Sequence, residues 1–86
     1  MFSATVTITN KTGLHARPAS QLVELCKTFE SQITLKKGDM LVDPKSIISI
    51  LAGGLKQGTT VELTAEGSDE ETAGKEVLAF IEGLTE

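Results

Sequence analysis

The sequence is poor in the residues that cross-link small proteins or stack on nucleic-acid bases. It has one cysteine, no tryptophan and no tyrosine, and only three phenylalanines among 86 residues. A single cysteine cannot form an internal disulfide, so we expect a chain held together by packing, as is typical of a reducing compartment. Cys26 is therefore predicted to be a small buried hydrophobic residue. The scarcity of aromatic rings argues against base stacking.

The sequence also lacks long apolar runs and an excess of positive charge. No segment approaches the roughly 20 apolar residues of a membrane span, and no basic stretch precedes an apolar signal core, so we expect no membrane insertion and a cytoplasmic location. Eight Lys and Arg against twelve Asp and Glu give a net charge of −4, which argues against direct binding to nucleic acid. One His and one Cys do not make a metal site, and we expect no cofactor.

The patterning predicts one domain, residues 1–86, with strands and helices in alternation. Apolar and polar residues alternate in three segments, and a Gly-Asp hairpin signal at 38–39 adds a further strand. The predicted strands are 2–9, 33–36, 40–42 and 60–65.

Three helices are predicted from apolar spacing and capping residues. Residues 16–28 carry apolar side chains at helical spacing, and a short helix follows Ser46, which is expected to cap it. A third helix is expected to begin at a capping box of Ser68 and Glu71 and to contain Gly74 and Gly83. The order is βαββαβα. Because each strand has one apolar face, we predict an α+β, open-faced two-layer sandwich with a four-stranded, mainly antiparallel sheet covered on one face by three helices.

The segment Gly13-Leu14-His15-Ala16-Arg17-Pro18 places the only histidine of the chain where a loop becomes a helix. Pro18 fits the first turn, so His15 is expected near the N-cap, where free N–H groups and the helix dipole favour an anion. The same positive field favours the neutral imidazole, which is a good nucleophile. Arg17 adds guanidinium donors that match phosphate oxygens, and Ala16 and Pro18 are expected to support the phosphate site. An ordinary helix cap or a solvent-exposed histidine is the alternative that these residues leave open.

Two motifs together resemble the HPr family, the histidine phosphocarriers of the bacterial phosphoenolpyruvate-dependent sugar phosphotransferase system. NKTGLHARPAS resembles the family's phosphorylation site, and Lys45-Ser46-Ile47 followed by an apolar turn resembles its regulatory serine region. The resemblance implies that His15 accepts a phosphoryl group on Nδ1 from phosphorylated enzyme I and donates it to a sugar-specific IIA component, with help from Arg17. It implies a carrier without independent turnover.

The same resemblance implies regulation through Ser46 by an ATP-dependent HPr kinase/phosphorylase, together with binding to a catabolite control repressor. A purely regulatory module that acts through Ser46 is the alternative function, and the presence of His15 favours the carrier. The short helix and the helix after His15 are expected to form the partner surface, and a monomer is expected because that surface must stay exposed. The predicted partner contacts are Ser20, Val23, Ile47, Ile48 and Leu51, although Ile50 and part of Val23 are expected to be buried.

The sequence departs from the family pattern at a few positions of the short helix. Family members commonly have Met in place of Ile48, Gly in place of Ser49, and a Leu-Gly pair in place of Gly53-Gly54. These departures bear on partner preference and on how the short helix ends, and they leave His15 and Arg17 unchanged.

Overall fold

The computed structural model describes residues 1–85 and contains a four-stranded antiparallel sheet. Its strand order is β1-β4-β2-β3, so the first strand lies beside the last one rather than beside its neighbour in sequence. The strands align Val6 of β1 with Val61 of β4, and Leu35 of β2 with Leu63 of β4. The strands are β1 (Phe2–Thr7), β2 (Gln32–Lys37), β3 (Met40–Val42) and β4 (Thr60–Glu66).

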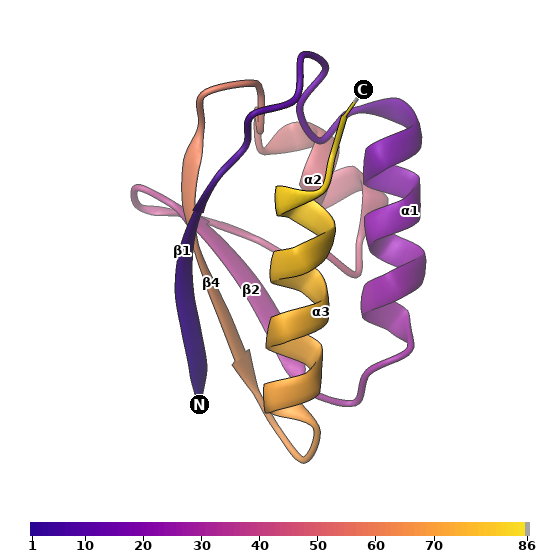
Figure 1. Ribbon diagram of the computed structural model, residues 1–86, viewed down its shortest axis with the longest axis vertical. Coiled ribbons are helices and arrows are strands. Elements are labelled where there is room, and N and C mark those ends of the chain that lie inside the picture. The colour runs from indigo at the N-terminus through magenta and orange to yellow at the C-terminus, as the bar shows by residue number, and fades with distance from the viewer. Residues whose placement is uncertain (86) are drawn as a thin grey trace.

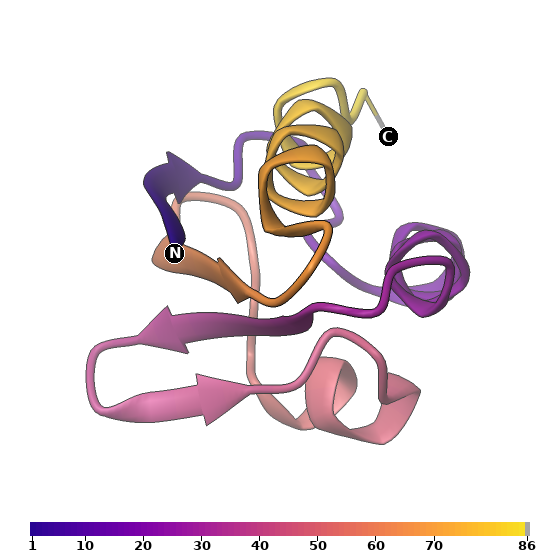
Figure 2. The same cartoon turned by 90° about the horizontal axis from the view of Figure 1, so that it is seen from below.

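Three helices cover one face of this sheet and leave the other face open. Figure 2 shows the strands on the left and all three helices on the right. The helices are α1 (Ala16–Lys27), α2 (Ile47–Ala52) and α3 (Glu70–Glu82). The predicted βαββαβα order and the open-faced two-layer sandwich are confirmed.

The core lies between the sheet and the helices. Alternate strand residues such as Val6, Leu35 and Leu63 point into it, and they meet the apolar sides of α1 and α3. Cys26 of α1 is fully buried there, and burial raises the pKa of its thiol to about 12. One continuous core therefore runs through the described part of the chain.

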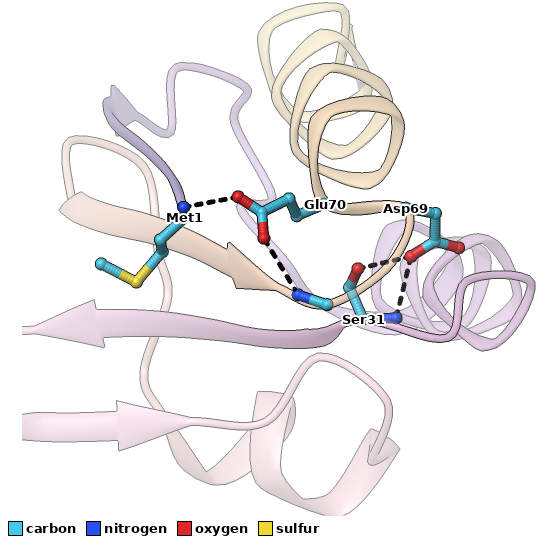
Figure 3. Close-up of polar contacts among 5 residues, drawn as sticks. Met1, Ser31, Asp69 and Glu70 are labelled. Carbon is cyan, nitrogen blue, oxygen red and sulfur yellow. Dashed lines mark hydrogen bonds and ion pairs between the residues drawn. The ribbon is translucent and has the colours of Figure 1, made fainter.

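The start of α3 differs from the prediction. Its N-cap is Asp69 rather than Ser68. Asp69 accepts hydrogen bonds from the backbone N–H and the hydroxyl of Ser31 (Figure 3). It also accepts one from the N–H of Glu30. The Ser68 hydroxyl lies 3.1 Å from a carboxylate oxygen of Glu30. The predicted capping box is wrong because these residues are used in contacts between distant segments.

Glu70, rather than Glu71, contacts the residues that precede α3 in the sequence. Its carboxylate accepts from the Gly67 N–H and pairs with the amine of Met1, which ties the start of β1 to α3 (Figure 3). At the other end, Gly83 is the C-cap of α3 rather than an interior residue. The last helix therefore ends at Glu82, before the Gly83 that the prediction placed inside it.

Candidate functional site

His15 lies where the loop after β1 becomes α1. The start of α1 is at the upper end of the molecule in Figure 1. It is the N-cap residue, with an extended backbone (φ −134°, ψ 154°), as the position of Pro18 predicted. Its side chain is exposed and makes no capping hydrogen bond to any described residue. The imidazole is therefore presented to solvent rather than used to close the helix.

The loop before His15 is fixed by a close approach to a second loop. Gly13 has φ +63°, and a Cβ at this position would lie 2.4 Å from the carbonyl oxygen of Leu55 and 2.7 Å from the Cα of Lys56. Leu14 donates its N–H to the same Leu55 oxygen at 2.8 Å. The buried side chain of Asn10 donates to the Gly13 carbonyl at 3.0 Å. Gly13 is required because only a residue without a side chain fits between the loops.

The first turn of α1 creates a positive local field beside His15. The N–H groups of a first helical turn have no carbonyl partner within the helix, and the helix dipole adds partial positive charge. Arg17 is exposed in this turn and adds a full charge. Ala16 has φ 49°, a left-handed conformation that costs roughly 1–2 kcal/mol for a residue with a Cβ. Pro18 is buried, so its contribution is to fix the start of the helix rather than to touch an anion.

A groove of about 130 Å³ opens beside the histidine. Its walls come from the loop before α1, from the end of α2 and from the loop that leads to β4. The residues that line it are Thr12, Leu14, His15, Leu51, Gly54, Leu55 and Lys56. The site can therefore hold a small group attached to the imidazole.

Ser46 occupies the position predicted for it, as the N-cap of α2. Its hydroxyl accepts a hydrogen bond from the N–H of Ser49 at 3.3 Å, and the side chain is half-buried. Ser49 in turn uses its own hydroxyl to accept from the N–H of Asp43 at 2.8 Å. The predicted capping role of Ser46 is confirmed, and Ser49, one of the departures from the family pattern, gains a bond that glycine cannot make.

The structure separates the predicted partner contacts into exposed and buried residues. Ile48 is 77% exposed, Leu51 is 50% exposed and Ile47 is 38% exposed, whereas Ile50 is fully buried as expected. Ser20 is exposed on α1. Val23 is only 7% exposed and packs in the core, so it offers little surface to a partner. We define Ile47, Ile48 and Leu51 as the apolar patch; Leu51 also lines the groove beside His15.

The remaining departures from the family pattern lie at the end of α2. Gly53 caps this helix, and a Cβ there would lie 2.8 Å from a methyl group of Val42, so a larger residue would force this buried side chain to shift. Lys56 also lines the groove, although the sequence does not mark it as part of the site. No local pattern marks it, because Lys56 reaches the groove only through the contact between its loop and Gly13.

An exposed histidine at a helix N-terminus, two residues before an arginine and beside a small groove, is an arrangement suited to carrying an anionic group. Comparison with known proteins identifies the family. Residues 2–83 match the family model described as the PTS HPr component phosphorylation site. The chain is 38% identical over 84 residues to phosphocarrier protein HPr of Haemophilus influenzae, covering 98% of this chain and 99% of that protein.

Two further similarities agree. The HPr-like protein Crh of Halalkalibacterium halodurans is 38% identical over 82 residues, covering 95% of this chain and 98% of Crh. The crystal structure of HPr-C-His from Thermoanaerobacter tengcongensis has a TM-score of 0.92 at 48% identity, covering 95% of this chain and 92% of that one. The chain belongs to the HPr family of phosphocarrier proteins of the phosphotransferase system. Members of this family carry a phosphoryl group and are not independent catalysts.

The geometry of residues 1–85 meets the requirements of neither a membrane-spanning helix nor a clustered metal site. None of the helices among them is both long and apolar enough to cross a bilayer. No group of three or more His, Cys, Asp or Glu side chains in this range is arranged to hold a metal ion.

Proposed function

We propose that His15 accepts a phosphoryl group on Nδ1 from phosphorylated enzyme I and donates it to a sugar-specific IIA component. In each step the bond from phosphorus to the donor breaks as the bond from phosphorus to the acceptor nitrogen or other nucleophile forms. Arg17 and the first-turn N–H groups, including that of Ala16, stabilise the charge on the transferred group. Because both transfers pass through a similar charge distribution, the same groups assist in both directions.

The observation that carries this proposal is the exposure of the His15 imidazole at the N-cap of α1, with no capping bond to any described residue. The helix-cap alternative requires such a bond, so it loses its support, whereas the alternative of a merely solvent-exposed histidine is decided by whether His15 forms an adduct. The adjoining apolar patch supports docking, since exposed apolar side chains next to a reactive group are typical of partner surfaces. The proposed contacts with enzyme I and the IIA component are Ser20, Ile47, Ile48 and Leu51, with Val23 supporting them from beneath.

Incubation with phosphoenolpyruvate and enzyme I tests the proposal. The chain contains one histidine, so any acid-labile phosphoryl adduct of the histidine type must be on His15. We expect such an adduct in the native chain and none in His15→Ala. The Arg17→Gln variant should keep the adduct but form and lose it more slowly, whereas loss of a remote charge in Lys75→Gln should have no effect. A native chain that stays unmodified would refute the carrier role.

We propose a second role for Ser46 as a regulatory phosphorylation site for HPr kinase/phosphorylase. Its hydroxyl is half-buried at the start of α2 and immediately precedes the apolar patch. A phosphate there adds roughly −2 charge and places it beside this patch, which weakens docking of enzyme I and creates a feature that a catabolite control repressor can bind. Phosphorylation of Ser46 is also compatible with the alternative of a purely regulatory module. Formation of a phosphoryl adduct on His15 would exclude that alternative.

An ATP-dependent modification experiment separates regulation from simple capping. With ATP and the kinase we expect an acid-stable adduct in the native chain and in Ser49→Ala, but not in Ser46→Ala. Modification should lower the rate of phosphoryl transfer from enzyme I to His15. If Ser46 is not modified, its role is limited to capping α2.

We further propose that residues 1–86 act as one cytoplasmic, monomeric domain. The single core supports one domain, and a buried Cys26 that needs no oxidising environment supports the cytoplasm. A monomer keeps the apolar patch open for partners. Sedimentation at micromolar concentration should give one species of about 9.1 kDa; a stable dimer that covers the patch would contradict this proposal.

A further inference from the structure

The groove beside His15 brings a second cation to the site from a different part of the chain. Lys56 lines this groove together with His15, although 41 positions separate them in the sequence. Arg17 lies on α1, after the histidine, whereas Lys56 lies on the loop between α2 and β4. Each of the two segments that meet near His15 therefore carries one positively charged residue, Arg17 or Lys56.

Backbone contacts hold Lys56 in this position. Its N–H donates to the Gly54 carbonyl at 2.9 Å, and its own carbonyl accepts from the N–H of Thr59 at 3.0 Å. The Cα of Lys56 packs against Gly13, and the adjacent Leu55 carbonyl accepts from Leu14. The loop is consequently fixed to the segment that carries His15, while the Lys56 side chain itself is exposed and able to move.

The composition of the groove favours an anion near Lys56. Leu14, Leu51 and Leu55 supply apolar walls, and none of the described residues that line the groove is acidic. A phosphate dianion on the imidazole would therefore have Lys56 as a cationic partner, and no described acidic residue of the groove competes for that lysine. His15 and Lys56 are both exposed, so solvent partly screens a charge pair at this place and its contribution is modest.

We infer that Lys56 binds the phosphoryl group carried by His15. This inference rests on the proposed phosphocarrier function and extends it to the residue that holds the group between transfers. During transfer the bond from phosphorus to the donor breaks and its electron pair stays with the donor, while the P–N bond to His15 forms. Lys56 keeps its proton, makes no covalent bond and contributes only charge and hydrogen bonds to phosphate oxygens.

The equilibrium constant of the transfer distinguishes phosphoryl binding from partner docking. For the reaction of phosphorylated enzyme I with this chain, the equilibrium constant depends only on the free reactants and products, and not on how well the two proteins dock. A Lys56→Gln variant that loses a contact to the phosphoryl group should therefore lower this constant, by about two- to fivefold for a partly exposed charge pair. Lys56→Arg should restore it.

The experiment measures the phosphorylated fraction at equilibrium with known amounts of enzyme I, phosphoenolpyruvate and pyruvate, together with KM and kcat for the chain. The matched control is Lys75→Gln, which removes the same charge from an exposed position on α3. Far-UV circular dichroism checks that each variant is folded. We expect a lower phosphorylated fraction in Lys56→Gln only, with native behaviour in Lys75→Gln and Lys56→Arg.

Each other outcome overturns the inference. A higher KM with an unchanged equilibrium would assign Lys56 to docking, and equal losses in Lys56→Gln and Lys75→Gln would indicate a general effect of net charge. In both cases the native chain is still phosphorylated, so the proposed function survives. A native chain that accepts no phosphoryl group would instead refute the proposed function and this inference together.

Discussion

Replacing Gly13 by alanine should damage both the stability of the protein and the geometry of the site. The backbone at Gly13 has φ +63°, which costs roughly 1–2 kcal/mol for alanine. In addition, the new Cβ would lie 2.4 Å from the Leu55 oxygen and 2.7 Å from the Cα of Lys56. Both are backbone atoms and cannot rotate away, so the loops must separate, and overpacking of this kind costs about 1–3 kcal/mol. We therefore expect Gly13→Ala to lower the free energy of unfolding by about 2–5 kcal/mol.

Gly38 provides a matched control for the steric part of this loss. It has a similar backbone, φ +58°, but a Cβ there would meet no atom within 4 Å. Gly38→Ala should therefore show only the backbone cost, about 1–2 kcal/mol. Urea unfolding followed by circular dichroism measures both variants, since the chain has no tryptophan or tyrosine to serve as a fluorescence probe.

The same pair of variants tests the link between this contact and function. Separation of the two loops should slow phosphoryl transfer to His15 in Gly13→Ala even under conditions in which the variant is fully folded, whereas Gly38→Ala should transfer normally. If Gly13→Ala were no less stable than Gly38→Ala, the close approach of the two loops would not be a constraint on the fold, and the reasoning would be refuted.

Three further predictions concern the scaffold. Gly74→Ala gains about 1 kcal/mol of helix propensity. Its Cβ would however lie 2.1 Å from the Phe2 ring, and overpacking costs about 1–3 kcal/mol, so urea unfolding should show a net loss of stability. The Ser31 hydroxyl and nearby N–H groups hold the pKa of Asp69 below its ordinary value of 3.8. The ionised carboxylate therefore stabilises the fold above pH 3.8, and this stabilisation is lost as the pH falls through the lowered pKa. Asp69→Asn should be less stable than the native chain at pH 7, and the difference in stability should shrink in acid. Burial and a thiol pKa of about 12 should leave Cys26 unreactive toward iodoacetamide at pH 8 until the protein unfolds, and rapid labelling of the folded chain would contradict this.

Local patterns were sufficient to predict the elements of the fold because each strand and helix carries its own periodicity. Val6, Leu35 and Leu63 mark the buried side of their strands, and all three are buried as the alternation predicts. The start of α3 could not be predicted in this way. Asp69 takes the N-cap position while its carboxylate binds Ser31, which lies 38 residues earlier, and no local pattern contains this contact.

The same distinction between local patterns and contacts of distant segments applies to the candidate site. His15 and Ser46 could be placed at helix N-caps because Pro18 and the apolar run after Ser46 mark where those helices begin. The burial of Val23 and the position of Lys56 depend on how α1, α2 and the following loop pack together. Helical spacing shows that Val23 lies on an apolar face, but it does not show which part of that face another element covers.

The central claim is that the exposed imidazole of His15 takes up a phosphoryl group and releases it again. The most direct test is phosphorus NMR of the native chain with enzyme I, first with phosphoenolpyruvate and then with an excess of pyruvate. We expect a phosphoramidate signal that appears with phosphoenolpyruvate and disappears when pyruvate reverses the transfer. A chain that gives no such signal, or one that persists after the reversal, would contradict it.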